Sequence, residues 1–305
     1  MRLGTAARVT FFAVLALGGC GPAVERPPLL ANGGAAWRML ANTEPAVANP
    51  VSSNACGAGS PACIAAVVTE MTRRLEILAA RCSHEAPFAL MYLRVTQGVG
   101  TQGVARFNNT EFLNHLDAVF ANLYFTAYDN WEDGRTQLVP EAWRIAFEAA
   151  DRGTVSALGD MLLGMNAHIS RDLPFALART GLRRPDRQSG EADFNRVNGL
   201  LGSVTPQLLA EEAERFDPTV TSTAVPAIQL DPSSLQQLLG AWRSESWQNA
   251  ERLLAAHTPR QRAQVERTIE LGAAGRARLI ASLTSNLVIG PDAAQRNRYC
   301  ERHRG

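Results

Sequence analysis

Apolar residues recur at three- and four-residue spacing almost without a break from Ala62 onward. This is the period of an amphipathic α-helix, and the chain shows neither β-α-β alternation nor a glycine-rich phosphate-binding fingerprint. We therefore predict an all-α domain packed as a single bundle of roughly eight to ten helices. The expected helices cover residues 62–82, 85–95, 109–130, 140–151, 154–171, 174–180, 189–204, 207–215, 233–256 and 259–287.

Capping and helix-breaking residues set the expected helix ends. Asn109 has a side chain that caps the N-terminus of the helix after it. The Gly-Val-Gly segment 98–100 is expected to end the helix before it, and Pro206 is expected to divide residues 189–215 into two helices. The proline-bearing stretch 217–231 is expected to form a strand or a loop.

Residues 1–19 have the pattern of a bacterial signal peptide. Two arginines precede the apolar run VTFFAVLAL, which is too short to span a bilayer as a stable anchor. The run ends in the string LGGC, which resembles the lipobox of bacterial lipoproteins and places Cys20 at the lipidated position. This resemblance implies that residues 1–19 are removed and that fatty acyl chains such as palmitate anchor Cys20 in the cell membrane, outside the cytoplasm. The alternative is an ordinary signal peptide followed by an incidental cysteine.

Residues 20–60 have the composition of a tether. They are rich in Pro, Gly, Ala and Asn and carry no sustained hydrophobic period. We therefore divide the chain into a signal peptide (1–19), a lipidated N-terminus with a flexible tether (20–60) and a helical domain (61–305).

Four cysteines remain once Cys20 is assigned to lipid, and an even number favours disulfides in an exported protein. The sequence alone allows three pairings. We favour Cys56–Cys63, which closes a loop rich in Gly, Ser and Pro, and Cys82–Cys300, which ties the C-terminus to the domain. A zinc site is the competing interpretation, but the spacing contains no Cys-x-x-Cys pair.

All 30 basic residues are arginine, and the chain contains no lysine. Enzymes that need a primary amine are therefore excluded, including Schiff-base and pyridoxal-phosphate enzymes and kinases with an ATP-binding lysine. The formal net charge is +1 and becomes −1 once the two arginines of the signal peptide are removed. A balance so close to zero gives no electrostatic argument for nucleic acid as a partner.

The candidate functional residues centre on the string LLGMNAHISRDLPFAL at 162–177. His168 and Asp172 lie four residues apart, so on a helix they share one face and can share a metal ion or a hydrogen bond. Gly164 lies one turn before His168 and leaves room for a ligand or a close helix. The simpler interpretation is a buried His–Asp pair that only supports packing.

Polar residues on other expected inner faces join these candidates: Asn166, Asp117, Asp193 and Asn198. A buried carboxylate such as Asp117 needs an arginine, hydrogen-bond donors or a cation, and Arg171 is a candidate partner. Asn198 most simply hydrogen-bonds between helices. Polar groups from several helices thus point toward one interior, which is how helical bundles build ligand or metal sites and also how they fix their register.

Six blocks of the sequence resemble a bacterial all-helical family of unknown function: MYLRVT (91–96), LDAVFANLYF (116–125), AWRIAF (142–147), LLGMNAHISRDLPFAL (162–177), DFNRVNGLL (193–201) and AWRSESWQNAERLL (241–254). Members carry a similar Gly-Met-Asn-Ala-His-Ile-x-x-Asp-Leu-Pro string followed by an Asp-Phe/Tyr-x-x-x-Asn helix. The resemblance runs over residues 86–256 and implies a shared fold. It also implies a shared site around Asn166, His168, Asp172, Asp193 and Asn198, but it brings no established activity.

A weaker resemblance links one motif to the zinc-dependent phospholipase C and single-strand nuclease superfamily, which is also all-helical and exported. His168 and Asp172 match its His-x-x-x-Asp helix, in which both residues bind zinc. This chain has Phe-Ala-Leu after the following proline, where the superfamily has a histidine. The resemblance therefore implies at most one metal ion, held by His168, Asp172 and one or two carboxylates such as Asp117 or Asp193. Among the other histidines, His84 is expected at the surface.

Two functional hypotheses follow. The favoured one is an uncharacterised, membrane-anchored lipoprotein whose helical domain binds a small ligand or a cell-envelope protein. In the alternative, a metal-dependent hydrolase resembling a phosphoesterase, a divalent ion at His168 and Asp172 lowers the pKa of bound water. The sequence assigns no catalytic residue and leaves open whether the protein is an enzyme.

Overall fold

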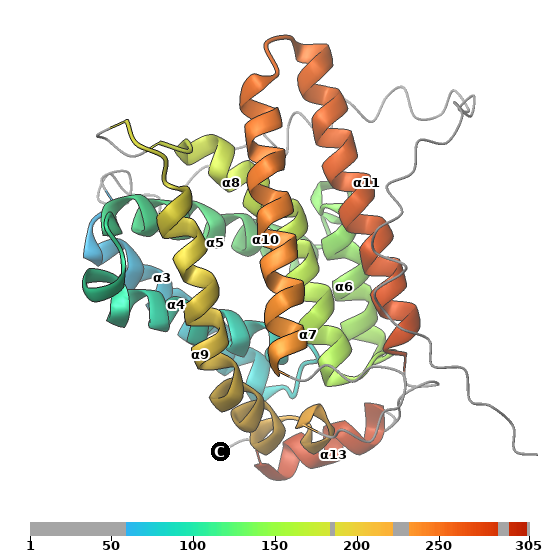
Figure 1. Ribbon diagram of the computed structural model, residues 1–305. Helices are drawn as coiled ribbons and strands as arrows, with labels where there is room; N and C mark the ends of the chain where they lie inside the picture. Colours follow the sequence, from blue (N-terminus) through green and yellow to red (C-terminus); the bar gives the residue numbers. More distant parts are fainter. Residues whose placement is uncertain (1–58, 184–186, 222–231, 286–292, 304–305) are drawn as a thin grey trace, which may run out of the picture.

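The computed structural model describes residues 59–183, 187–221, 232–285 and 293–303. These residues form a multi-helix all-α bundle, which confirms the predicted fold class (Figure 1). Within them there is no strand, and β pairing is limited to two isolated bridges, Val155 with Ser285 and Arg183 with Ser189. None of the described helices combines the length and the hydropathy that a membrane span requires.

The helices are α3 (Pro61–Ala80), α4 (Ala86–Arg106), α5 (Thr110–Glu132), α6 (Glu141–Arg152), α7 (Ala157–Asn166), α8 (Leu173–Thr180), α9 (Glu191–Arg215), α10 (Pro232–Ala255), α11 (Pro259–Leu283) and α13 (Ala293–His303). A π-helical segment, η5 (Ala167–Asp172), joins α7 to α8 without a break. We call the continuous element formed by α7, η5 and α8 the central rod.

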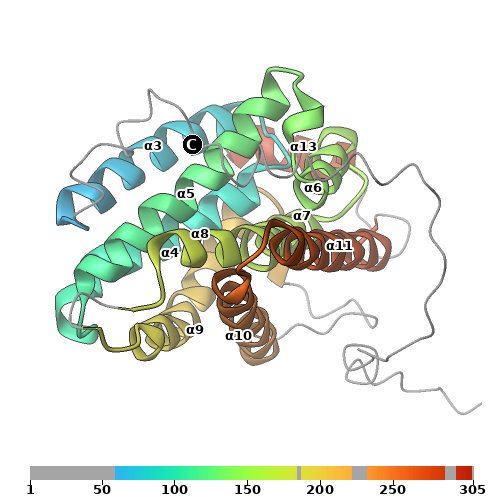
Figure 2. The ribbon, with the colours of Figure 1, turned by 90° about the horizontal axis from the view of Figure 1, so that it is seen from above.

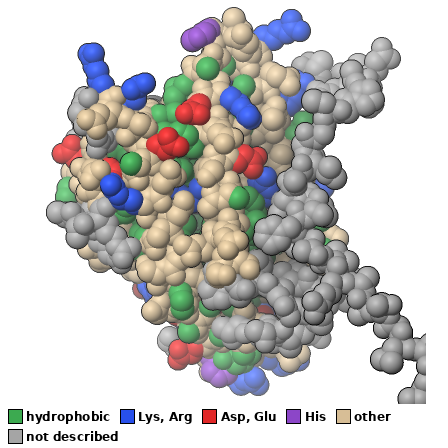
Figure 3. All heavy atoms as spheres, in the orientation of Figure 1, with side chains coloured by type: hydrophobic (Ala, Val, Ile, Leu, Met, Phe, Trp, Pro, Cys, Tyr) green, Lys and Arg blue, Asp and Glu red, His purple; other side chains and the backbone are tan. Residues whose placement is uncertain are grey.

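The central rod lies between two sets of helices. On one side α3, α4 and α5 form a layer, and on the other α10 and α11 form a long hairpin that runs roughly perpendicular to that layer (Figure 2). The rod contacts α4 and α5 in the layer and α10 and α11 in the hairpin. Residues of the rod therefore reach the centre of the core. At the surface, the face in Figure 3 carries acidic and basic side chains interspersed, in keeping with the small net charge.

Local capping explains several helix ends. Asn109 caps α5 as predicted, because its Oδ1 accepts a hydrogen bond from the Phe112 amide at 2.9 Å. Thr258 and Gln261 form a capping box at the start of α11, in which each side chain bonds the other residue's amide. Gly153 ends α6 in the left-handed region, at a φ of 57°.

Two predicted breaks are wrong because tertiary packing overrides the local signal. Helix α4 continues through residues 98–100. A Cβ on Gly98 would lie 3.0 Å from Leu200 of α9, so this glycine allows close approach of two helices. Helix α9 continues through Pro206, with buried residues on both sides of it. A proline inside a helix removes one backbone hydrogen bond, and this packing outweighs that loss.

The break predicted between residues 171 and 174 is absent because the chain forms a π turn there. Pro174 has no amide hydrogen, and in a regular α-helix its ring would clash with the carbonyl of Ser170, four residues earlier. The wider turn of η5 accommodates both effects and keeps the rod continuous. The Ser246 hydroxyl of α10 donates to the Ile169 carbonyl at 2.6 Å, which ties the π turn to the hairpin.

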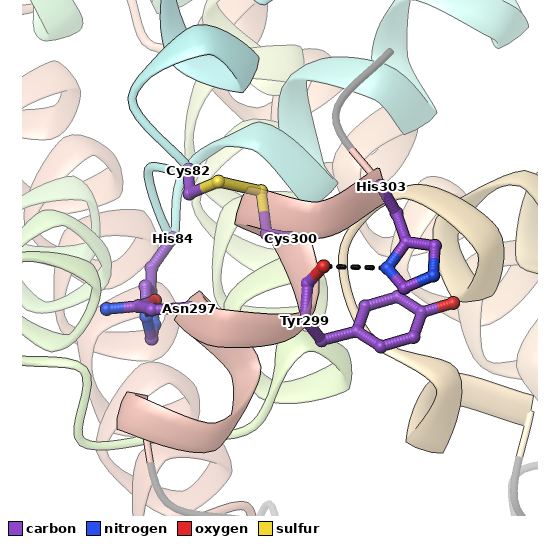
Figure 4. Close-up of a disulfide and its surroundings, with 6 residues drawn as sticks. All are labelled: Cys82, His84, Asn297, Tyr299, Cys300 and His303. Atoms are coloured by element: carbon purple, nitrogen blue, oxygen red, sulfur yellow. Dashed lines mark hydrogen bonds between the residues drawn. A yellow bond between two sulfur atoms is a disulfide. The ribbon is translucent and has the colours of Figure 1, made fainter.

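The disulfide between Cys82 and Cys300 is present, with Cα atoms 5.8 Å apart, and it confirms that predicted pairing (Figure 4). Cys63 is also disulfide-bonded. Its predicted partner Cys56 lies outside the described residues, as do Cys20, the predicted signal peptide and almost all of the predicted tether. The stretch 217–231 begins with a short 3-10 helix at Pro218–Thr221, and its remainder from residue 222 also lies outside them.

Helix α13 was not predicted from the sequence, and its docking corrects one further expectation. His84 is buried rather than at the surface, with an exposed fraction of 6%. Its Nε2 lies 2.9 Å from Asn297 Oδ1, and both residues lie close to the disulfide (Figure 4). Arg296 of α13 forms a buried ion pair with Asp160 of α7. The covalent link and these polar contacts hold α13 against the bundle.

We expect Gly164→Ala to lower the free energy of unfolding by about 1–3 kcal/mol through overpacking. A Cβ on Gly164 would lie 2.4 Å from the Phe88 ring, in the tightly packed contact between α7 and α4. Urea denaturation of the purified domain measures the change. The matched control is Gly272→Ala on α11, where a Cβ meets no atom within 4 Å. This control should gain about 0.5–1 kcal/mol from helix propensity. A similar gain for Gly164→Ala would contradict the close contact.

Candidate functional site

The Asp172 carboxylate is the centre of a buried hydrogen-bond network. It is fully buried, and Trp143 Nε1 of α6 donates to its Oδ2 at 2.7 Å. His168 Nδ1 lies 3.1 Å from the same oxygen, and Arg171 Nη1 donates to Oδ1 at 2.8 Å. Because a carboxylate only accepts hydrogen bonds, His168 donates from Nδ1 and its Nε2 carries the lone pair.

Further contacts tie this network to α11. Arg171 Nε donates to Glu270 Oε1 at 2.8 Å, and Asn166 Nδ2 donates to the Ala273 carbonyl at 2.9 Å. Burial alone would lower the pKa of Arg171, but the carboxylates of Glu270 and Asp172 outweigh it and raise that pKa. Burial raises the pKa of Glu270, partly offset by Arg171. The charged arginine is thus matched to two carboxylates inside the core.

The His168 ring is enclosed by aromatic side chains. It stacks on Phe120 with ring centroids 3.4 Å apart and lies edge-on to Tyr92 at 4.4 Å. Burial lowers the pKa of His168, and the bond to Asp172 opposes this only in part. The imidazole is therefore neutral at pH 7, with an Nε2 that has no hydrogen-bond partner among the described residues.

A cavity of about 80 Å³ lies beside this imidazole, lined by side chains of α4, α5, the central rod, α9 and α10. Its lining is mainly apolar, and the hydrogen-bonding side chains in it are Tyr92, Asp117, His168 and Arg243. Three of these residues carry a buried polar atom without a partner in the described structure: Tyr92 Oη, Asp117 Oδ2 and His168 Nε2. An apolar cavity with a few convergent polar groups is the usual form of a small-molecule site.

Burial raises the pKa of two of these groups. It raises the pKa of Asp117 to about 7, and no charged neighbour opposes this. It raises the pKa of Tyr92 well above its ordinary value, with smaller contributions from the carboxylates of Asp117 and Asp172. At neutral pH the cavity therefore offers a phenol and a partly protonated carboxyl group as donors, and the imidazole as an acceptor.

Arg243 of α10 reaches the cavity from the side of α9. Its Nε donates to Asn198 Oδ1 and its Nη2 to the Phe194 carbonyl, each at 2.7 Å. The guanidinium carbon lies 4.1 Å from the centroid of the Phe194 ring. Burial lowers the pKa of Arg243 to about 9.

The structure brings together most, but not all, of the residues predicted from the sequence. Asn166, His168 and Asp172 belong to one network, and Asp117 lines the cavity next to it. Asn198 bonds between helices, as its simplest interpretation predicted.

Asp193 has a different place in the structure. Its carboxylate accepts hydrogen bonds from the Asn108 and Asn109 amides, both at 2.9 Å, before the first turn of α5. Over the described ranges, no group of three or more His, Cys, Asp or Glu side chains is placed to hold a metal ion. The arrangement that the metal hypothesis required, with Asp117 or Asp193 beside His168 and Asp172, is not assembled there.

Sequence reasoning missed three residues of the site: Tyr92, Trp143 and Arg243. It offered Arg171 as a partner of Asp117, whereas Arg171 pairs with Asp172 and Glu270. The three missed residues lie in the blocks MYLRVT, AWRIAF and AWRSESWQNAERLL, which carry the family resemblance. Those blocks were the available signal, but helical periodicity alone does not show which of their residues meet.

The fold and the site define an all-helical domain with a buried polar network beside a small apolar cavity. The chain belongs to a family of unknown function, DUF5995, whose model matches residues 64–283. This match runs from α3 to the end of α11 and confirms the predicted membership of an uncharacterised all-helical family. No curated protein and no solved structure matches the chain.

We expect Asp117→Asn to change how stability depends on pH. The folded state holds a proton on Asp117 up to about pH 7, whereas the unfolded chain releases it near pH 4. The wild type therefore loses stability through this group as pH rises from about 4 to 7, and the variant does not. Relative to the wild type, the variant should gain about 2–3 kcal/mol between pH 5 and pH 8.

Urea denaturation at the two pH values tests this expectation. Asp133→Asn is the control, because Asp133 is exposed and lies just beyond the same helix. The control should follow the wild-type pH dependence. Parallel curves for Asp117→Asn and the wild type would contradict the assigned burial of this carboxyl group.

Proposed function

We propose that this domain binds a small, mostly apolar molecule in the cavity beside His168. The observation that carries this proposal is the set of buried polar atoms without partners: Tyr92 Oη, Asp117 Oδ2 and His168 Nε2. Leaving such an atom unsatisfied costs about 1–3 kcal/mol. All three residues line the same cavity, so a ligand with matching groups would relieve this cost at one place.

The size of the cavity limits the ligand. A cavity of about 150 Å³ holds benzene, so a volume of 80 Å³ has room for roughly three or four non-hydrogen atoms. The apolar lining favours a short hydrocarbon segment. The phenol of Tyr92, the carboxyl group of Asp117 and the imidazole of His168 favour a polar group that both donates and accepts hydrogen bonds.

The buried network supports a binding role because it fixes the imidazole before any ligand arrives. Asp172 sets the tautomer of His168, and Trp143 and Arg171 hold Asp172 in turn. A group whose rotamer and tautomer are fixed loses little entropy when a ligand binds. No observation of the described site favours the metal-dependent hydrolase.

We also propose that the domain works at the cell membrane, outside the cytoplasm, held by lipid on Cys20. The support is the string LGGC after an apolar run and two arginines. Acyl chains contribute about 0.8 kcal/mol for each buried methylene, so several chains would anchor the protein stably. On a domain anchored in this way, the cavity would be accessible to small molecules of the cell envelope.

Binding is tested with the purified domain and a panel of short alcohols, amides and carboxylates. We expect at least one compound to raise the melting temperature and to shift the NMR signals of His168 and Tyr92. Val197→Phe should abolish both effects, because Val197 lines the cavity and the larger side chain fills it. Val119→Phe is the matched control on α5, partly buried but outside the cavity lining. If no compound binds, or if Val197→Phe binds as the wild type does, the proposal is wrong.

Lipidation is tested by expressing the full chain in a bacterium with an alkyne analogue of palmitate. We expect the wild type to carry the label and to fractionate with membranes, and Cys20→Ser to lose both properties. Ser52→Ala, a small change outside the motif, should leave them intact. Unlabelled wild type, or label that persists in Cys20→Ser, would overturn the proposed anchor.

A further inference from the structure

We infer that the ligand of this cavity is an anion, a short alkyl carboxylate whose carboxylate group is bound by Arg243. The inference rests on the proposed function and specifies the chemical class of the ligand. Arg243 lines the cavity, its exposed fraction is 7%, and no carboxylate pairs with it among the described residues.

Comparison with the other buried arginines of the described structure shows that the lack of a carboxylate partner is unusual. Arg74 pairs with Asp129 and Glu70, Arg171 with Asp172 and Glu270, and Arg296 with Asp160. A buried charge without a counter-ion is costly, and proteins keep one where it binds something of opposite charge. Arg243 alone among these four buried arginines has only neutral partners, the Asn198 amide and the Phe194 carbonyl.

The geometry of the guanidinium leaves donors for a ligand. Its Nε and Nη2 are engaged by the two neutral acceptors, which fix the side chain, and it lies over the Phe194 ring. Nη1 has no acceptor in the described part of the chain. A planar guanidinium held in this way presents free N–H groups in the fork that matches a carboxylate.

Asp117 is not the missing counter-ion, although it lines the same cavity. If the two groups were close, Arg243 would hold the pKa of Asp117 down and Asp117 would hold the pKa of Arg243 up. No ion pair joins Asp117 and Arg243 in the described structure: Asp117 Oδ2 has no partner there, and both hydrogen bonds of Arg243 go to neutral acceptors. In keeping with this, burial is the only cause of the shifts in the pKa of Asp117 and of Arg243. The cavity lining therefore combines an unpaired cation, Arg243, with a separate polar group formed by Tyr92, Asp117 and His168.

This division orients the ligand. Its carboxylate group lies at the end formed by α9 and α10, where Arg243 stands. The cavity has room for roughly three or four non-hydrogen atoms, so the enclosed part of the ligand is the carboxylate group and the adjoining carbon, which packs against the apolar wall of α4 and α5. The second carboxylate oxygen is then left to accept a hydrogen bond from Tyr92 or Asp117, which carry unpaired polar atoms. A neutral amide of the same length fits the same space but leaves the buried charge uncompensated, so it should bind more weakly.

The experiment compares the short carboxylates acetate, propionate and butyrate with the corresponding amides by calorimetric titration at neutral pH. We expect the best carboxylate to bind at least about tenfold more tightly than its amide. Arg243→Gln should remove this preference by weakening the carboxylate alone, and Arg243→Lys should retain part of it. Arg276→Gln is the matched control, since Arg276 also lies beside an aromatic ring, that of Trp242, but does not line the cavity.

The outcomes separate this inference from the proposed function. If the amides bind the wild type as tightly as the carboxylates, the cavity binds ligands but the inference is overturned. If neither series binds the wild type, the proposed function fails, and the inference fails with it. If Arg243→Gln does not fold, the comparison in the wild type and in Arg243→Lys still decides, because a preference for carboxylates either exists there or does not.

Discussion

The position of the Asp172 carboxylate determines much of this structure. It is fully buried, and it accepts hydrogen bonds from α6 through Trp143 and from its own π turn through His168 and Arg171. Arg171 carries the network on to Glu270 of α11. Loss of these donors would leave a buried carboxylate unpaired and would destabilise the fold by several kcal/mol. The network therefore fixes the positions of α6, the central rod and α11 relative to one another. This arrangement places the His168 ring at the wall of the cavity.

The cavity results from two packing constraints on either side of this network. Gly164 lets Phe88 of α4 approach the backbone of the rod, which brings the aromatic side chains of α4 and α5 around the imidazole. The π turn before Pro174 widens the rod at His168 and is tied to α10 by the Ser246 hydroxyl. Aromatic rings are rigid and do not collapse into a small space as flexible side chains do, so a void with polar edges remains between the layer and α9.

The fold class and part of the site could be predicted from the sequence, because both depend on contacts within single helices. The four-residue spacing of His168 and Asp172 and the capping side chain of Asn109 are local signals, and local signals determine contacts within a helix. Gly98 and Pro206 also carry local signals, but there tertiary packing decided the outcome, and both helices continue. Arg243 could not be identified as part of the site, because neither burial nor the absence of a counter-ion is visible in a linear pattern.

The exclusive use of arginine as the basic residue gives the unpaired charge its significance. A buried lysine can release its proton near neutral pH and so avoid the cost of an isolated charge, whereas arginine does so far less readily. Even with its pKa lowered to about 9, Arg243 stays charged at pH 7. Its neutral partners and the Phe194 ring orient the guanidinium without cancelling the charge. These contacts stabilise the cation in part, and an anion that enters the cavity would supply the counter-charge that the described residues do not.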